Sequence, residues 1–186
     1  APLYFDACLK ELYPTIKFGA TTYLIPKSFF MFPVKLVEFL NRYQINTICW
    51  VVSALTMISS LGVLDKVKPE YLKTIAFGSE VFPIKQFQIW RKVLPETTFI
   101  NLYGPTEATV GCAVYLYAGE KSDSVPIGHP IDNTVIYLLD KNGMFLSETE
   151  IGEIYISGES VAIGYHNEKK QGGFLMIRII PGNACI

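Results

Sequence analysis

The chain has 186 residues, of which half are hydrophobic and 18% are charged, and its formal net charge is −1. A chain of this size and composition can bury a core, either as one large domain or as two small ones. Lys and Arg are scattered rather than gathered in a stripe, which argues against a nucleic-acid partner. The longest apolar run carries several polar residues and is more typical of a strand followed by a helix than of a membrane span.

The four cysteines, Cys8, Cys49, Cys112 and Cys185, lie far apart and lack the close pairs that are typical of a metal site. We interpret them as reduced thiols. The first residues contain neither a basic segment nor a long apolar one, so they predict no signal peptide. These features predict a cytoplasmic protein without a membrane partner. The chain begins without Met, which indicates a start inside a longer gene product or after a cleaved tag.

The first part of the chain predicts two helices with a strand between them. A short helix begins near Cys8 and ends at a turn that contains glycine, and a strand follows over residues 21–25. Pro33 begins the second helix, because a proline in the first turn removes no hydrogen bond. The apolar face of that helix comprises Val34, Leu36, Val37, Phe39 and Leu40.

Three apolar segments, 45–52, 72–77 and 98–103, predict strands that are buried on both faces. A helix capped by Ser53 is expected after the first of them, and a helix that begins after Pro83 is expected after the second. The order strand, helix, strand, helix, strand with short links predicts a parallel sheet with right-handed crossovers.

The character of the sequence changes after about Tyr117. Residues 118–126 are polar and rich in turn formers, and the segments "TVIYLLD" and "GEIYISG" that follow are separated by the turn "KNGM". The predicted fold class is therefore α/β. A parallel-sheet βαβ subdomain over residues 1–117 precedes a small antiparallel β subdomain over residues 118–167.

Glycine and polar residues follow two of the predicted parallel strands. "GSE" (78–80) ends one strand and "GPTE" (104–107) ends the next, while Asp6 follows two aromatic residues at a third strand-like segment. Ligands of open α/β sheets bind beyond the carboxyl ends of the strands. Glycine lets a backbone approach a flat or charged ligand. A carboxylate beside a hydroxyl suits Mg²⁺ that is shared with phosphate oxygens.

The segment "NLYGPTEAT" resembles the core motif of the adenylate-forming (AMP-binding) superfamily. This superfamily includes the amino-acid adenylation domains of nonribosomal peptide synthetases, D-alanine–carrier-protein ligases and acyl-CoA synthetases. "YFDACLKELYPTIKFGATTYLIP", "PIGHPIDNTVIYLLD" and "GEIYISGESVAIGYHN" resemble further blocks of the family, in family order. The resemblance covers nearly everything from Ala1 to Asn167. One position departs from the pattern, since Ile163 stands where the family usually has Arg.

The resemblance implies a site for ATP and Mg²⁺. Tyr103 would lie against the adenine ring, Thr106 would contact a phosphate, and Glu107 would hold Mg²⁺ directly or through water. Thr106 and Glu107 are therefore the expected catalytic residues. The full implied nucleotide-binding set is Gly78, Ser79, Glu80, Asn101, Tyr103, Gly104 and Thr106.

The resemblance also implies a substrate pocket along the same strands. Asp6 would accept the α-ammonium group of an amino acid, which acyl- and aryl-activating relatives do not require. A large Phe77 in the pocket indicates a small amino acid, whereas Lys10 would suit an acidic one, and this choice stays open. The implied lining residues are Asp6, Ala7, Lys10, Cys49, Ile75, Phe77, Leu102, Val110 and Gly111.

Several of these residues also have a purely structural interpretation. Asp6 could cap the N-terminus of a helix, and Glu80 and Glu107 could be solvated loop acids. Tyr103 could belong to the core. For Cys49 an inert buried thiol is the favoured interpretation. The four ordered motifs favour function for Asp6, and the place of Glu80 and Glu107 at adjacent strand ends favours function for these two acids.

Three parts of the family's machinery have no counterpart in the sequence: the phosphate loop that ends in Lys, the "TGD" segment, and the lysine-bearing C-terminal domain. We therefore interpret the chain as a truncated fragment. A shifted reading frame that starts in the Leu175 codon can encode "NDPYYPGKRMY", which resembles the family's continuation. Our hypothesis is a frameshift between about Glu168 and Gly173. Residues 168–186 would then be an out-of-frame tail that contributes little to the fold.

The parent enzyme is expected to form an aminoacyl-AMP and to pass it to a phosphopantetheine thiol of a peptidyl or acyl carrier protein, or to CoA. The fragment alone is expected to be inactive. Two alternatives remain open. One is a fragment of an acyl-CoA or aryl-CoA synthetase. The other is a non-catalytic remnant that self-associates through exposed subdomain interfaces.

Overall fold

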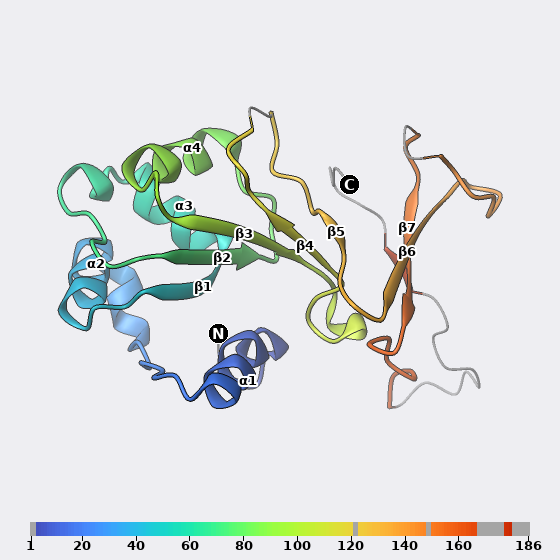
Figure 1. The fold of residues 1–186 in the computed structure, drawn as a ribbon, viewed down its shortest axis with the longest axis horizontal. Helices are drawn as coiled ribbons and strands as arrows, with labels where there is room; N and C mark the ends of the chain where they lie inside the picture. Colours follow the sequence, from blue (N-terminus) through green and yellow to red (C-terminus); the bar gives the residue numbers. More distant parts are fainter. Residues whose placement is uncertain (1–2, 121–122, 148–149, 167–176, 180–186) are drawn as a thin grey trace.

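The computed structural model of the chain describes residues 3–120, 123–147, 150–166 and, for the backbone alone, 177–179. It contains a five-stranded sheet in the order β1-β2-β3-β4-β5 and a three-stranded sheet in the order β6-β7-β8 (Figure 1). The predicted fold class, α/β with a parallel sheet followed by a small antiparallel unit, is confirmed. Within the described ranges, none of the helices is both long and apolar enough to cross a membrane.

The parallel part of the first sheet has the predicted alternation of strands and helices. β1 (Thr47–Val51), β2 (Thr74–Gly78) and β3 (Thr98–Tyr103) run parallel to one another. α3 (Val52–Ser60), followed by the short 3-10 helix η3 (Val63–Asp65), links β1 to β2. α4 (Ile84–Val93) links β2 to β3.

The N-terminal elements agree only in part with the prediction. α2 (Pro33–Arg42) begins at its proline, as predicted, and follows the 3-10 helix η2 (Lys27–Met31). α1 (Leu9–Phe18) follows the 3-10 helix η1 (Asp6–Cys8) and contains no buried residue. The strand predicted at residues 21–25 is wrong, because the described chain is irregular there.

The larger core lies between the sheet and helices α2, α3 and α4. Phe77, Phe82, Phe87 and Phe99 form a chain of contacting rings there. The indole N–H of Trp90 donates a hydrogen bond of 3.0 Å to the Leu55 carbonyl, which ties α4 to α3. In Figure 1, α3 and α4 lie on one side of the sheet and α1 lies on the other.

Two strands that the sequence did not predict extend the first sheet. β4 (Ala113–Leu116) runs antiparallel to β3, and β5 (His129–Pro130) runs antiparallel to β4. Val125 returns to the larger core in the loop between them. The change from one sheet to the other therefore falls between β5 and β6, which is later than the predicted boundary at residues 118–126.

The second sheet contains the predicted antiparallel pair β6 (Thr134–Leu139) and β7 (Glu153–Gly158). β8 (Ile177–Ile179) pairs with β7. These three residues give the predicted out-of-frame tail, 168–186, a short strand in the fold. The rest of that segment lies outside the described residues.

Candidate functional site

The carboxyl ends of β2 and β3 lie side by side, with Gly78 opposite Leu102. A Cβ atom at Gly78 would lie 2.2 Å from the Leu102 carbonyl oxygen, so the position accepts glycine alone. The next residue, Ser79, has a φ of 72°, which is costly for a side chain other than glycine. The backbone therefore turns sharply away from β2 while it stays close to β3.

Glu80 stabilises the start of α3. Its Oε2 accepts a hydrogen bond of 2.8 Å from the Ser53 backbone N–H, in the first turn of that helix. The N-cap residue is Val51, which has no side-chain acceptor, so the prediction that Ser53 caps this helix is wrong. A carboxylate at a helix N-terminus accepts a hydrogen bond from a free N–H and interacts favourably with the helix dipole. Glu80 therefore caps α3 in place of Ser53. Its contribution to nucleotide binding stays a prediction.

Asn101 and Tyr103 lie on β3 in different surroundings. Asn101 is buried, and its Nδ2 donates a hydrogen bond of 2.7 Å to the Pro126 carbonyl, which ties β3 to the loop before β5. Tyr103 is half-buried and packs on the smaller core with Cys112. Burial, and to a smaller degree the nearby Cys112, raises the pKa of the Tyr103 phenol. Burial also raises the pKa of the Cys112 thiol to about 11, so Cys112 is a protonated, unreactive core residue at neutral pH.

Thr106 and Glu107 lie in the 3-10 helix η4 (Thr106–Ala108), which follows β3 almost directly. The two ends of the loop that contains η4, residues 103–104 and 111–112, lie against each other, and we call this closure the neck. A Cβ atom at Gly104 would lie 2.5 Å from the Gly111 Cα, and the Cys112 N–H donates a hydrogen bond of 2.8 Å to the Tyr103 carbonyl. The neck fixes η4 at the end of β3, and the Thr106 side chain is exposed there.

The same loop contains strained backbone. The Gly111 N–H donates a hydrogen bond of 3.0 Å to the Thr109 carbonyl, and Val110 between them has a φ of 76°. This is the rare γ-turn with a positive φ, here at a β-branched residue. Strain of this kind gathers at functional sites. Val110 is one of the residues that the sequence assigns to the substrate pocket.

The remaining predicted pocket residues lie on opposite faces of the sheet. The Phe77 side chain is 1% exposed, and its ring centroid lies 5.0 Å from that of Phe82 in the larger core. Ile75 is buried in the same core. Since strand residues alternate between faces, both point away from the face of Cys49. The prediction that Phe77 and Ile75 line the pocket is therefore wrong, and the size argument for a small substrate falls with it.

α1 brings Lys10 close to Cys49. Burial, the largest effect, raises the pKa of the Cys49 thiol, while the charges of Lys10 and Glu11 lower and raise it respectively. Asp6 and Ala7 lie in η1, half-buried, directly before α1. The N-cap residue of η1 is Phe5 and that of α1 is Cys8, neither with a side-chain capping bond. The capping role considered for Asp6 is therefore not observed.

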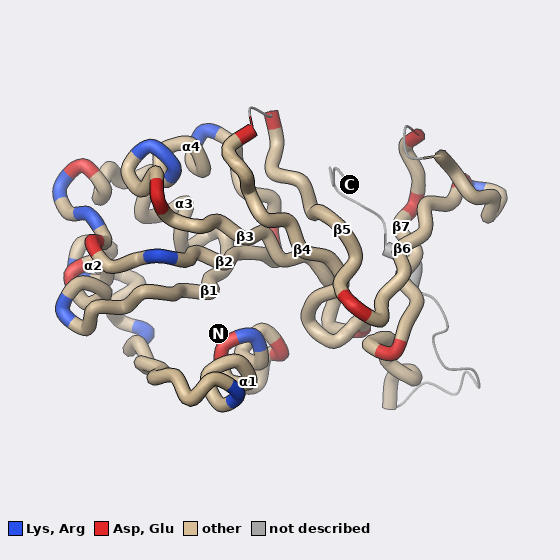
Figure 2. Tube along the Cα trace, viewed as in Figure 1, with Lys and Arg blue, Asp and Glu red and all other residues tan. Residues whose placement is uncertain are grey.

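The charges around η4 suit a divalent cation that arrives with a phosphate. The loop 104–112 contains no Lys or Arg, and in Figure 2 most Lys and Arg residues lie on and around the helices, with one at the start of β2. Among the described residues, no cluster of three or more His, Cys, Asp or Glu is arranged for a metal. Glu107 beside Thr106 offers one carboxylate and one hydroxyl. Mg²⁺ is commonly held in this way, with phosphate oxygens and water as its other ligands.

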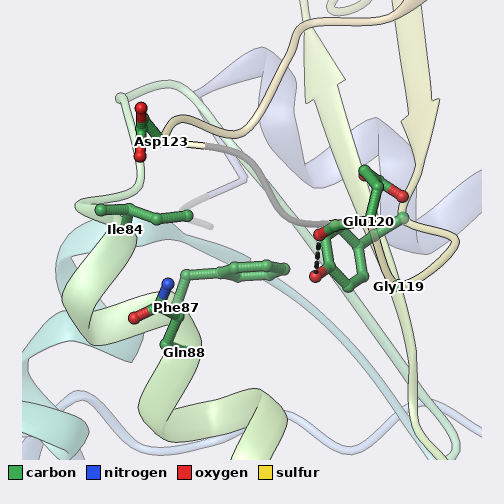
Figure 3. A pocket seen from close by; sticks show the side chains of 7 residues that line it. Ile84, Phe87, Gln88, Gly119, Glu120 and Asp123 are labelled. Carbon is green, nitrogen blue, oxygen red and sulfur yellow. Dashed lines mark hydrogen bonds between the residues drawn. The ribbon is translucent and has the colours of Figure 1, made fainter.

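A hollow of about 380 Å³ opens elsewhere, on the side of the sheet that α4 covers (Figure 3). The Tyr117 hydroxyl donates a hydrogen bond of 2.7 Å to the Glu120 carbonyl at its edge. None of the predicted site residues lines it, so it is distinct from the strand ends. Its lining residues are Ile84, Phe87, Gln88, Tyr117, Gly119, Glu120 and Asp123.

Sequence reasoning missed the contacts between η4 and the loop after β7. The Tyr165 hydroxyl donates a hydrogen bond to Oε1 of Glu107. The Ala162 N–H donates one of 2.8 Å to the Glu107 carbonyl, and Thr109 Oγ1 donates one of 2.6 Å to the Ser160 carbonyl. The signal in the sequence was the family-like block "VAIGYHN", which contains Tyr165.

The chain is similar in sequence to known proteins. The family described as "AMP-binding enzyme" matches residues 1–166. Nonribosomal peptide synthetase asaC of Aspergillus flavus is 34% identical over 163 residues, which are 87% of this chain and 16% of that protein. The L-proline–[L-prolyl-carrier protein] ligase of Pseudomonas fluorescens is 30% identical over 175 residues, which are 93% of this chain and 35% of that protein.

Solved structures are similar in fold. McyG A-PCP complexed with phenylalanyl-adenylate superposes with a TM-score of 0.79 at 20% identity, over 95% of this chain and 31% of that one. PA1221, which contains adenylation and PCP domains, gives 0.77 at 22% identity, over 96% of this chain and 38% of that one. At these identities the likeness shows the fold alone. The chain spans well under half the length of each of these relatives.

Proposed function

The chain belongs to the family of AMP-binding enzymes, and from that premise we propose that it forms part of an ATP-dependent amino-acid adenylation site. The amino acid carboxylate attacks the α-phosphate of ATP and expels pyrophosphate. The phosphopantetheine thiol of a carrier protein or of CoA then attacks the carbonyl carbon of the aminoacyl-AMP, takes up the aminoacyl group as a thioester and releases AMP. One observation carries the proposal. The carboxyl ends of β2 and β3 lie side by side, and β3 leads directly into the closed loop that holds Thr106 and Glu107.

We assign the nucleotide to these strand ends. Gly78 and Ser79 form one wall, because no side chain stands between the backbone there and β3. Tyr103 offers a half-buried aromatic face for adenine. The Thr106 hydroxyl donates a hydrogen bond to a phosphate oxygen. Glu107 holds Mg²⁺, which neutralises part of the phosphate charge. Catalysis of this kind depends on position and electrostatics rather than on a protein nucleophile.

We assign the amino acid to the sheet face beneath α1. Asp6 accepts the α-ammonium group, a role that its lack of a capping bond leaves open. The site takes Ala7 and Lys10 from η1 and α1, and Cys49 from β1. Leu102 and Val110 contribute from the end of β3 and the loop after it. The name of one relative, a prolyl ligase that is 30% identical, supports an amino acid over an acyl or aryl substrate. The free cysteines among the described residues agree with a cytoplasmic location.

The test measures the affinity of the chain for AMP in the presence of Mg²⁺, by calorimetry or by saturation-transfer NMR. Tyr103→Ala should weaken AMP binding about tenfold, since stacking on an aromatic ring contributes about 1–3 kcal/mol per base. Tyr71→Ala, at an exposed residue before β2, is the matched control and should leave the affinity unchanged. Equal affinities of the two variants, or no AMP binding by the wild type, would overturn the proposal.

We further propose that the chain alone turns over slowly. Its loop 104–112 contributes no cationic side chain to the phosphates, and the chain spans only 16% and 35% of two relatives. Amino-acid-dependent exchange of pyrophosphate into ATP should be far below that of a complete relative. A panel of amino, fatty and aryl acids in this assay, on the chain within its full gene product, separates the substrate classes, D-alanine among them. The frameshift hypothesis is tested by sequencing the source DNA across residues 168–186.

A second candidate function has its own observation. Large apolar side chains on α1, Tyr13, Ile16 and Phe18, are each about two-thirds or more exposed. A chain with such a surface can act by association with another copy rather than by catalysis.

A further inference from the structure

The loop that follows β7, residues 159–165, is built onto η4 by contacts of three kinds. We name it the β7 loop. Its backbone is bonded to η4 through the Ala162 N–H and the Glu107 carbonyl. The Thr109 hydroxyl donates a hydrogen bond of 2.6 Å to the Ser160 carbonyl. Val161 packs against the smaller core, which includes Ala108 of η4.

These contacts give the β7 loop a firm base. The smaller core joins Ala108 and Cys112 of the first sheet's loop to Ile154 and Ile156 of β7. All four side chains are at most 1% exposed. The base of the β7 loop is therefore held by buried apolar contacts and two backbone acceptors, none of which involves the Tyr165 side chain.

Tyr165 adds a contact of a different kind. Its hydroxyl donates a hydrogen bond to Oε1 of the Glu107 carboxylate, at the surface of the molecule. A glutamate side chain has three rotatable bonds, so it loses rotamer entropy when it is fixed. A donor on one oxygen fixes the carboxylate plane and directs the second oxygen to one place.

We propose that Tyr165 is a positioning residue for the Glu107 carboxylate and prepares it to bind Mg²⁺. The inference depends on the proposed role of Glu107 as the cation ligand. The Tyr165 hydroxyl occupies Oε1 and leaves Oε2 to the cation or to its water. Partners that orient a ligand carboxylate commonly change metal affinity about 10- to 100-fold when they are removed. The second sheet thereby contributes to the site through one side chain.

The alternative is that Tyr165 merely anchors the β7 loop. The two ideas differ in what the hydroxyl does. Because the base of the loop is held without it, Tyr165→Phe should leave the loop in place. A positioning role predicts weaker cation binding in that variant, whereas an anchoring role predicts a looser loop with unchanged cation binding.

The experiment measures Mn²⁺ affinity in the presence of AMP, by calorimetry, for the full chain. Tyr165→Phe should raise the Kd for Mn²⁺ about tenfold and leave the Kd for AMP without metal unchanged. The matched control is Tyr155→Phe, since the Tyr155 hydroxyl also bonds a glutamate, Oε2 of Glu153 at 3.3 Å, in the second sheet. In a Glu107→Gln background, Tyr165→Phe should cause no further loss.

A second readout needs no metal. The ¹³C signal of the Glu107 carboxyl, recorded at constant pH, should shift and broaden in Tyr165→Phe and stay unchanged in Tyr155→Phe. If the wild type binds no Mn²⁺, the proposed role of Glu107 fails, and an altered carboxyl signal then still supports the positioning contact. If Mn²⁺ binding and the carboxyl signal are both unaffected by Tyr165→Phe, the inference is overturned while the proposed function stands.

Discussion

At the scale of single residues, Gly78 is the position where the structure permits least change. Gly78 is the last residue of β2, which is paired on both sides, with β1 and with β3, so the strands have little room to move away from the 2.2 Å clash that a Cβ atom would make with the Leu102 carbonyl oxygen. Gly78→Ala should lower the free energy of unfolding by about 1–3 kcal/mol, the usual cost of an overpacked interior. Urea denaturation followed by Trp fluorescence measures it.

Gly111→Ala is the matched control for that variant. A Cβ atom there would meet its nearest neighbour, the Tyr103 carbonyl oxygen, at the ordinary distance of 3.9 Å. We expect a loss below about 0.5 kcal/mol, as for a surface substitution. Similar losses at the two glycines would mean that close contact between β2 and β3 is not what excludes a side chain.

Glu80 has a structural effect that can be measured without a ligand. Glu80→Ala removes the acceptor for the Ser53 N–H at the start of α3 and should cost about 1 kcal/mol of unfolding free energy. Glu38→Ala, which removes an exposed acid of α2, should change stability by less than half of that. If both variants unfold at the same urea concentration, Glu80 does not stabilise α3.

Single residues also show how far sequence reasoning reaches. The motif placed Thr106 and Glu107 correctly at the end of β3, because a Tyr-Gly-Pro turn after an apolar strand has few possible geometries. Phe77 was assigned to the wrong face, since an apolar run that is buried on both sides carries no alternation to decide which face each residue takes. Tyr165 could not be found, because its contact with Glu107 spans 58 positions.

At the scale of elements, the turn after β6 depends on one carboxylate. Asp140 Oδ1 accepts hydrogen bonds of 2.8 Å from the N–H groups of Met144 and Asn142. These bonds, that of Met144 foremost, hold the pKa of Asp140 below its ordinary value. A carboxyl with a depressed folded-state pKa stabilises the fold above its unfolded pKa, and this contribution is lost as the pH falls through the folded value.

The turn should therefore loosen below about pH 4, the ordinary range of an aspartate. Amide NMR signals of Asn142 and Met144 should move with pH in this window. In Asp140→Asn, which keeps a side-chain oxygen but does not titrate, they should be insensitive to pH there. Equal pH dependence in both proteins would show that another group controls the turn.

The elements that were predicted correctly share one property, which is a strong local signal. α2 and α4 each start at or directly after a proline, and β2 and β3 are short apolar runs. The strand expected at residues 21–25 failed because a strand needs a partner, and here the Thr22 hydroxyl pairs with that of Thr15 in α1, 2.7 Å away. β4 and β5 were missed because their antiparallel pairing is decided by tertiary contacts.

At the scale of the whole molecule, α1 presents an exposed apolar surface. Its side chains Ile16 and Phe18 are each about three-quarters exposed, at 76% and 75%. Neighbouring apolar side chains on a surface favour association when another apolar surface is present. A second copy of the chain provides one, so the mass from light scattering should rise with protein concentration.

The variant Ile16→Glu with Phe18→Glu should remove this association, because it places two charges on α1 where no buried residue is disturbed. The matched control, Ile151→Glu with Phe145→Glu, changes an equally exposed pair in the second sheet's loops and should associate like the wild type. A monomer at every concentration, or equal effects of the two variants, would contradict a role for α1. The light-scattering test needs no nucleotide, so its outcome is independent of the test of AMP binding. A chain that self-associates through α1, and that binds AMP only when Tyr103 is intact, has both properties.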